Sequence, residues 1–331
     1  MNMNKLKNTA MAVATLLLVS CTATSQKIKE KTVKKHLYTL ASDDMEGRRA
    51  GTPGIEKAAQ YIEGEFEKVG LTTFNGADDF RQSFKKTIKG KELDLFNVIG
   101  VLEGKSKKDE YVVISAHYDH LGIGKSVDGD SIYNGANDDA SGVAAVLALA
   151  DYFKKKDINE RSILFVAFTA EEMGLVGSNY FGTTVDADKI VAGINIEMIG
   201  KTPSFGPNTA WLTGYERSDF GKIVQKNLEG TGYVLHPDPY KKFNLFFRSD
   251  NASLARLGVP AHTFSTSPID TDKDYHQASD NPETLDVGVI TETIKAIAVG
   301  TTSMIDGTDT PTRVQLTDEE MNRRKKKKKS E

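Results

Sequence analysis

The stretch RSILFVAFTAEE, residues 161–172, decides the fold class. Six of its first eight residues are apolar, and such a short run is typical of a strand buried on both faces of a sheet. Two adjacent glutamates, Glu171 and Glu172, follow directly. Carboxylates are costly to bury unless cations or protons neutralise them. The pair therefore predicts a functional site where the strand ends.

The alternation of strand and helix recurs along the chain, and the long crossovers between strands imply parallel pairing. The sequence thus predicts an α/β fold with a mostly parallel central sheet flanked by helices. Strands are expected at residues 80–88, 93–102, 111–116, 161–168, 189–196 and 258–264, and helices at 27–42, 54–69 and 141–153.

Composition agrees with this fold class. The chain has 331 residues, of which 39% are hydrophobic and 27% charged, as expected for a globular protein with a sizeable core. The net charge of −3 gives no reason to expect a nucleic-acid partner. We expect a single domain from residue 21 to residue 310.

The N-terminus predicts export. Lys5 and Lys7 precede an apolar run, residues 10–19, that is too short to span a membrane and is typical of a signal peptide covering residues 1–20. The run ends in LVSC, residues 18–21, which resembles the bacterial lipobox. That resemblance implies a cell-envelope lipoprotein with its lipid on Cys21, facing the periplasm or the outside. A plain secretory signal is the alternative.

The C-terminal residues 311–331 are expected to form a disordered tail. Residues 323–329 are seven consecutive lysines and arginines, and like charges repel one another and stay solvated. Weak attraction to an anionic membrane surface is an open alternative.

Metal-binding side chains follow nearly every expected strand, and another pair precedes a helix. Since ligands bind beyond the carboxyl ends of parallel strands, these side chains should share one rim of the sheet. Imidazole and carboxylate without thiolate suit zinc, and the set is large enough for two ions that share one carboxylate. The candidates are His117, Asp119, Asp138, Asp139, Glu171, Glu172, Glu197, Asp270, Asp272, Asp274 and His276.

Six segments of the chain contain these candidates or follow them: SAHYDHLG (115–122), NGANDDASG (134–142), TAEEMGLVGS (169–178), INIEMIG (194–200), FRSDNASLARLGVPA (247–261) and DYHQASD (274–280). In this order they resemble the M28 zinc metallopeptidases, which are co-catalytic aminopeptidases and their relatives. The segment LASDDMEGRRAGTPG (40–54) resembles the N-terminal part of the same family.

The resemblance implies two zinc ions per chain. One ion would be bound by His117, Asp138 and Glu197, and the other by Asp138, Glu172 and His276, with Asp138 bridging. The family often has aspartate where this chain has Glu197, so the number of oxygens that Glu197 contributes is open.

The resemblance also implies roles for other side chains. Glu171 would be the general base, Asp119 would orient His117, and Tyr275 would polarise the scissile carbonyl. His120 is expected to line the cleft and receives no ligand role. Ser249 or Asp250 is expected to cap the following helix.

The implied function is hydrolysis of N-terminal residues from peptides by metal-activated water. A glutaminyl cyclase-like acyltransferase and a carboxypeptidase on the same scaffold are the alternatives. A carboxypeptidase would need a cation for the terminal carboxylate, and Arg248 is the candidate. A non-catalytic surface lipoprotein would predict decayed ligand positions, and none is decayed. The preferred N-terminal residue and the oligomeric state stay open.

Overall fold

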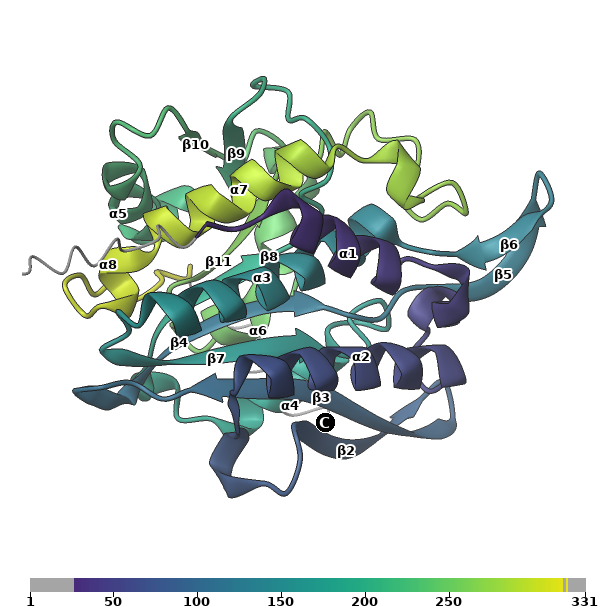
Figure 1. Cartoon of the computed structure of the whole chain (residues 1–331), viewed down its shortest axis with the longest axis horizontal. Helices are drawn as coiled ribbons and strands as arrows, with labels where there is room; N and C mark the ends of the chain where they lie inside the picture. The colour runs from purple at the N-terminus through teal and green to yellow at the C-terminus, as the bar shows by residue number, and fades with distance from the viewer. Residues whose placement is uncertain (1–26, 318–319, 321–331) are drawn as a thin grey trace, which may run out of the picture.

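The computed structural model describes residues 27–317 and residue 320 (Figure 1). The predicted signal peptide, Cys21 and the basic run 323–329 lie outside this range. No helix among the described residues is both long enough and apolar enough to cross a membrane.

A mixed sheet of nine strands forms the centre of the described chain, in the order β1-β3-β7-β4-β8-β11-β9-β10, with β2 also paired to β3. Its middle strands β7, β4, β8 and β11 are parallel, whereas β2 and β3 on one side and β9 on the other introduce antiparallel pairs. The strands are β1 (Thr72–Thr73), β2 (Arg81–Ile88), β3 (Lys91–Leu102), β4 (Lys107–His117), β7 (Arg161–Phe168), β8 (Ile190–Ile196), β9 (Thr209–Leu212), β10 (Val234–Pro237) and β11 (Ala261–Ser265).

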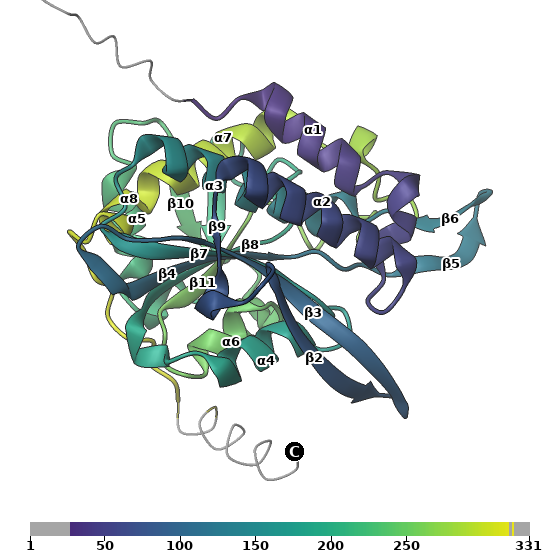
Figure 2. The same ribbon diagram turned by 60° about the horizontal axis from the view of Figure 1, so that its bottom comes forward.

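Helices cover both faces of this sheet. α1, α2, α3 and α7 lie together on one face, and α4 and α6 lie on the other (Figures 1 and 2). This arrangement confirms the predicted fold class. The helices are α1 (Glu30–Leu40), α2 (Pro53–Val69), α3 (Ser141–Lys156), α4 (Val176–Thr184), α5 (Phe220–Asn227), α6 (Asn251–Ala255), α7 (Val287–Gly300) and α8 (Thr302–Ile305).

Local sequence explains where these elements begin and end. All eight residues of β7 are buried, as its apolar run predicts. Proline at the first position of α2 costs no hydrogen bond, and Gly70 after its last residue adopts the left-handed conformation that ends many helices. The predicted strands 80–88 and 93–102 pair as the antiparallel ribbon β2–β3.

Three short strands and one hairpin were not predicted. β1, β9 and β10 have only two to four residues, too few to show a periodic pattern. The hairpin β5 (Gly122–Val127) and β6 (Asp130–Tyr133) extends away from the body of the protein (Figure 1). Most of β5 is exposed, so its sequence does not alternate between core and solvent.

The folded part continues past residue 310, the expected end of the domain. Val314 is buried, and its amide donates a hydrogen bond to the carbonyl of Gly258 (3.0 Å). The amide of Gln315 donates to the carbonyl of Arg217 (3.1 Å).

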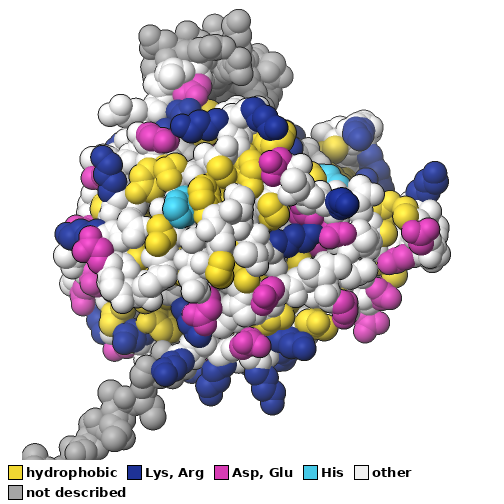
Figure 3. All heavy atoms as spheres, turned by 90° about the horizontal axis from the view of Figure 1, so that it is seen from above, with side chains coloured by type: hydrophobic (Ala, Val, Ile, Leu, Met, Phe, Trp, Pro, Cys, Tyr) yellow, Lys and Arg dark blue, Asp and Glu magenta, His cyan; other side chains and the backbone are white. Residues whose placement is uncertain are grey.

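On the face that carries α7, β9 and β10, apolar side chains gather across the middle and lysines and arginines lie mainly along the border (Figure 3).

Candidate metal centre

The carboxyl ends of the central strands bring the predicted site residues together. β4 ends at His117, which is paired in register with Phe168 at the end of β7. Glu197 directly follows β8, and its amide donates to the carbonyl of Phe264 in β11 (3.1 Å). Parallel pairing therefore places residues that lie far apart in the sequence at one edge of the sheet.

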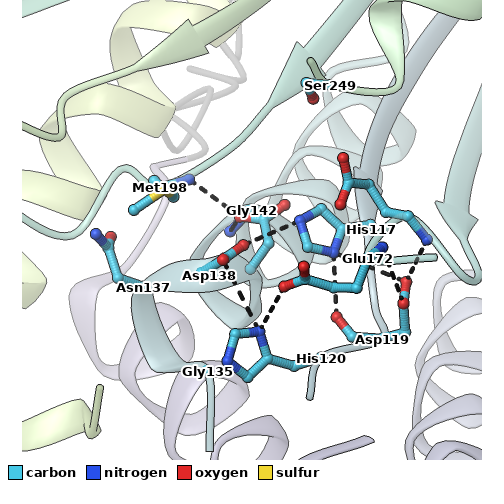
Figure 4. A network of polar contacts seen from close by, with 12 residues as sticks. His117, Asp119, His120, Gly135, Asn137, Asp138, Gly142, Glu172, Met198 and Ser249 are labelled. Carbon is cyan, nitrogen blue, oxygen red and sulfur yellow. Dashed lines mark hydrogen bonds and ion pairs between the residues drawn. The ribbon is translucent and has the colours of Figure 1, made fainter. Parts of the chain in front are cut away.

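Asp138 lies between two histidines. Its Oδ1 is 3.1 Å from Nε2 of His117 (Figure 4). Its Oδ2 is 3.2 Å from Nε2 of His276. The amides of Asn137 and Asp138 donate to the carboxylate of Asp280 (2.8 and 3.1 Å), which fixes the backbone here. A carboxylate whose two oxygens face different histidines has the orientation needed to bridge two cations.

Two groups of side chains at this edge could each hold a cation. One contains His117, Asp138 and Glu197, and the other contains His120, Asp138 and Glu172; within each group the ligand atoms lie within 4.8 Å of one another. Nε2 of His276 is also 3.1 Å from Oε2 of Glu172. The five residues predicted as ligands are thus close together in the structure.

His120 belongs to the site more closely than the sequence suggested. Its Nδ1 lies 3.0 Å from Oε1 of Glu172, and its ring is buried (Figure 4). The chain turns sharply after β4, so that the His120 amide donates to the carbonyl of Arg48 (3.2 Å). The only sequence signal was a second histidine three positions after His117.

Arg48 holds the two loops that supply these side chains. Its buried guanidinium donates to the carbonyls of Leu40 and Asn134 (both 2.6 Å) and to those of Tyr118 and Gly135 (both 2.9 Å). Four backbone acceptors satisfy a buried cation that forms no ion pair with a carboxylate in the described part of the chain. The N-terminal segment 40–54 therefore positions the metal-side loops and does not itself enter the cluster.

Asp119 lies beside His117, as expected, but its carboxylate is not the group nearest to that ring. Its carboxylate Oδ1 is 3.8 Å from Nδ1 of His117, whereas its backbone carbonyl is closer, at 3.1 Å. The carboxylate instead accepts hydrogen bonds from the amides of Glu171 (3.0 Å) and Glu172 (3.4 Å). Asp119 lies just beyond the end of β4, so the alternation of a strand no longer determines where its side chain points.

Glu171 lines a cavity together with Asp138, Glu197 and His276. Burial, with further contributions from Glu197 and other nearby carboxylates, raises the pKa of Glu171 well above its usual value. A raised pKa favours acceptance of a proton near neutral pH, which is the property of a general base.

Imidazole nitrogens and carboxylate oxygens are crowded together in this cluster, which suits the binding of cations. Burial raises the pKa of Glu197 to about 7. Burial alone would also raise the pKa of Asp138, but the close imidazoles of His117 and His276 hold it well below its usual range. Nε2 of His117, Nδ1 of His120 and one oxygen each of Glu172 and Glu197 are buried without a hydrogen-bond partner among the described residues. Unpaired buried donor atoms of this chemistry fit divalent zinc.

Three non-glycine residues with positive φ lie at the site. They are Ala170 before Glu171 (φ 54°), Met198 after Glu197 (φ 54°) and His276 itself (φ 58°). Such conformations are strained for ordinary residues and tend to cluster at functional sites. The surrounding structure therefore stabilises a backbone path that presents these side chains to the cavity.

Tyr275 also lines the cavity, and its ring stacks on that of His276 with 4.0 Å between centroids. Burial raises its pKa, so the phenol keeps its proton near neutral pH. Arg248 lies at the same cavity and is exposed.

Two expectations about the surrounding residues are wrong. Neither Ser249 nor Asp250 caps α6: the helix has no side-chain cap, and Oγ of Ser249 accepts a hydrogen bond from Nδ2 of Asn195 (2.6 Å). Asp272 and Asp274, expected among the metal-binding side chains, belong to neither candidate metal group, and both form ion pairs with Lys201. Sequence spacing alone does not reveal a partner seventy residues away.

Comparison with known proteins agrees with this geometry. Residues 97–300 match the model of peptidase family M28, so the chain belongs to that family. A probable zinc metalloprotease of Pyrenophora tritici-repentis is 29% identical over 185 residues, which are 52% of this chain but only 41% of that protein. The chain thus spans less than half the length of this relative.

Two solved structures share the fold. An aminopeptidase from Aneurinibacillus sp. strain AM-1 has a TM-score of 0.63 at 15% identity, and the match covers 88% of this chain and 96% of that one. Glutaminyl cyclase from Porphyromonas gingivalis has a TM-score of 0.66 at 16% identity, covering 84% and 99%. The same scaffold therefore occurs in proteins named for hydrolysis and for cyclisation, and the side chains of the site must distinguish the two.

Proposed function

We propose that this protein is a zinc-dependent aminopeptidase that removes residues from the free N-terminus of peptides. The observation that carries the proposal is the position of Asp138, with one oxygen near His117 and the other near His276. The family membership and the name of the Aneurinibacillus structure support the same activity.

The residues fit two zinc ions per chain. His117, Asp138 and Glu197 would hold one, and Asp138, Glu172 and His276 the other, with His120 as a further donor to the second. When bound, zinc would polarise the carbonyl of the substrate and lower the pKa of its bound water to about 7. Metal analysis of protein purified without chelator should approach two equivalents. A firm value of one in fully active protein would contradict the two-ion proposal.

The protein's own groups then handle the proton and the substrate. Glu171 accepts the proton of the attacking water and passes it to the leaving amine. The carboxylate of Asp119 holds the backbone of Glu171 in place by accepting a hydrogen bond from the Glu171 amide. Tyr275 is the candidate donor to the carbonyl oxygen of the scissile bond, since its phenol remains protonated. The carboxylates of the cavity favour a substrate ammonium group.

A panel of aminoacyl chromogenic amides tests the activity. The purified protein should hydrolyse at least one of them, lose that activity with chelator and regain it with added zinc. A protein that retains its metal but cyclises N-terminal glutamine, without hydrolysing any amide, would support the glutaminyl cyclase alternative instead.

We also propose that the mature protein is a lipoprotein of the cell envelope, anchored through Cys21. The support is the signal-like N-terminus and the sequence LVSC at residues 18–21. Stable anchoring requires more than one acyl chain, which lipidation at such a site supplies. Cys21→Ser should block processing or release the protein into the soluble fraction. Unchanged membrane fractionation of this variant would contradict the proposal.

A further inference from the structure

Exposed lysines gather where the folded chain begins and where α3 ends. We call this set the basic patch, and its members are Lys27, Lys29, Lys31, Lys34, Lys35, Lys154, Lys155 and Lys156. The chain as a whole has a net charge of −3, so the basic patch is a local concentration of positive charge.

The two segments that supply the basic patch lie side by side. One hollow of about 90 Å³ is lined by Lys27, Lys29 and Thr32 from the first segment and by Tyr152 and Lys155 from α3. α1 and α3 also pack against each other on the same face of the sheet (Figure 2). The start of α1 therefore meets the end of α3, and their lysines form one surface.

The carboxylates of these two segments are too few to neutralise the basic patch. Residues 27–35 contain Glu30, and residues 151–157 contain Asp151 and Asp157. Among the lysines of the patch, only Lys35 and Lys155 form an ion pair with a described residue, at 2.9 and 2.6 Å. The surface thus carries an excess of positive charge that the described residues leave unpaired.

Helix stability does not explain the lysines that begin α1. The N-cap position is occupied by Lys29, which makes no side-chain cap, and Lys27 and Lys31 lie on either side of it. Positive charge is unfavourable at a helix N-terminus, whereas it is favourable at a C-terminus such as that of α3. The lysines of α3 therefore stabilise their own helix, but those at the start of α1 need a negatively charged partner to offset their cost.

The lipid proposed on Cys21 would bring the basic patch to a bilayer. Five residues, 22–26, separate Cys21 from Lys27. Because an extended chain spans at most ~3.6 Å per residue, Lys27 would lie within about 20 Å of the lipid surface. Lysines that reach an anionic bilayer are attracted to it within roughly a Debye length, about 8 Å at physiological salt. An anionic phospholipid surface is therefore the partner that fits the position and the charge of the patch.

α3 connects the basic patch to the metal centre. It begins at Ser141, just after Asp138, and ends at Lys156. Its 16 residues span ~24 Å at the ordinary rise of an α-helix. The patch and the bridging carboxylate therefore lie at opposite ends of this helix.

We propose that the basic patch docks on a bilayer surface that contains anionic phospholipids, and that this contact turns the metal centre away from the bilayer. The inference goes beyond the proposed peptidase activity and rests on the proposed lipid anchor for the proximity of the bilayer. A single lipid anchor leaves a protein free to rotate, whereas a second, electrostatic contact fixes which face meets the lipid. The cleft then stays open to peptides in the aqueous phase.

Binding to vesicles tests the contact without the covalent lipid. The chain of residues 22–331 lacks Cys21 but contains every described residue. It should bind vesicles of phosphatidylglycerol and phosphatidylcholine more tightly than vesicles of phosphatidylcholine alone. The triple variant Lys29→Glu/Lys31→Glu/Lys156→Glu should weaken binding to the anionic vesicles about 100-fold, since each lysine near an anionic surface contributes about fivefold to affinity.

A second triple variant, Lys86→Glu/Lys89→Glu/Lys125→Glu, is the matched control. It makes the same change in net charge at exposed lysines that lie on β2, just after β2 and on β5. It should bind the anionic vesicles as the wild type does. Both variants keep the basic residues 323–329, so equal affinity in the two would assign binding to that segment or to net charge and would overturn the inference. Equal affinity of the wild type for both kinds of vesicle would also overturn it.

A single fluorescent label tests the orientation, because residues 22–331 contain no cysteine. Nitrobenzoxadiazole attached at Glu30→Cys, within the basic patch, should brighten when anionic vesicles are added. The same label at Ser126→Cys should not respond, because β5 lies between His117 and Asp138 in the chain, on the side of the metal centre. A response at Ser126→Cys, or none at Glu30→Cys, would overturn the orientation. Neither experiment requires lipidation or hydrolysis, so each can fail while the proposed anchor and activity stand.

Discussion

Adjacent glutamates at the end of β7 have different surroundings. Glu172 lies within 3.1 Å of two histidines, with Oε1 near His120 and Oε2 near His276. Glu171 forms no ion pair among the described residues, lines the cavity and has a raised pKa. The difference supports a division of labour in which Glu172 binds metal and Glu171 handles the proton.

Substitution of each glutamate separates these roles. Glu171→Gln should fold and keep its metal but lose activity by about 10²–10⁴-fold, because glutamine cannot accept the proton. Glu172→Gln should instead lower the metal content, since it replaces a charged ligand. Metal analysis and kcat of both variants, with thermal unfolding as the control for folding, provide the comparison. Loss of metal only in Glu171→Gln would mean that the two roles are reversed.

His262 predicts a pH dependence of stability. Burial lowers its pKa to about 4, and its ring contacts the carbonyl of Thr213 and the hydroxyl of Ser218 (both 2.8 Å). Between pH 6.5 and 4 the unfolded chain takes up a proton that folded His262 does not. Its contribution to stability is therefore complete above pH 6.5 and is lost as the pH falls.

Comparison with His262→Gln isolates this effect, because the other groups titrate in both proteins. The wild type should be more stable at pH 7 by about 1–3 kcal/mol, since glutamine cannot reproduce both contacts. The difference should shrink by about 2 kcal/mol between pH 7 and pH 5. Denaturant unfolding at several pH values measures it, and a difference independent of pH would contradict the prediction.

The segment between β11 and α7 carries His276 and Tyr275 but contains only one short 3₁₀ turn, Pro282–Thr284. Lys201, just beyond β8, is paired with Asp272 and Asp274 in this segment, the latter at 2.7 Å. The side chain of Asp272 is 1% exposed and also accepts from the hydroxyl of Ser267 (3.1 Å). A buried ion pair thus attaches the segment to the sheet.

Lys201→Met should loosen this segment, because it leaves a buried carboxylate without its cation. We expect a loss of about 2–4 kcal/mol in stability, less than for a fully buried pair because Lys201 is 15% exposed. One metal equivalent should be lost more easily than the other, since His276 would bind only one of the two proposed ions.

Metal titration, together with limited proteolysis of residues 266–286, measures the change in Lys201→Met. Lys201→Arg should largely restore the wild-type behaviour. Lys295→Met, which removes a surface pair with Glu292, is the control and should change neither property. Equal loss of both metals in Lys201→Met would argue against a local role.

Whether the protein binds the N-terminus or the C-terminus of a peptide substrate depends on the charge of the whole cleft. Asp138, Glu171 and Glu197 line the cavity where the reaction would occur, and such carboxylates stabilise an ammonium group and repel a terminal carboxylate. Acetylation of a good peptide substrate should therefore abolish its cleavage, whereas amidation of its C-terminus should change little. Mass spectrometry of the products measures both.

The opposite result would have a specific meaning. Cleavage that survives acetylation but not amidation would identify a carboxypeptidase. Arg248 would then be the first residue to substitute, because it is the cation at this cavity.

Local sequence determined the elements that carry the site. The apolar run 161–168 matches β7 to the residue, and expected ends elsewhere differ by a few residues, as for 111–116 within β4. The fold class followed from the order of strands and helices. The motifs also identified residues that the structure brings together, including His117, Asp138 and His276. These features depend on periodicity and on residue type, which a single sequence displays.

Tertiary structure decided which partner each polar side chain meets. The turn after β4 brings His120 to Glu172 and directs the Asp119 carboxylate to the amides of the glutamate pair. Lys201 and Asp272, far apart in the sequence, form an ion pair. The guanidinium of Arg48 donates hydrogen bonds to four backbone carbonyls, three of them from distant segments. The physical reason is that a buried polar group must be satisfied by whatever the fold places beside it. Those neighbours come from segments tens of residues apart, so no local pattern in the sequence specifies them.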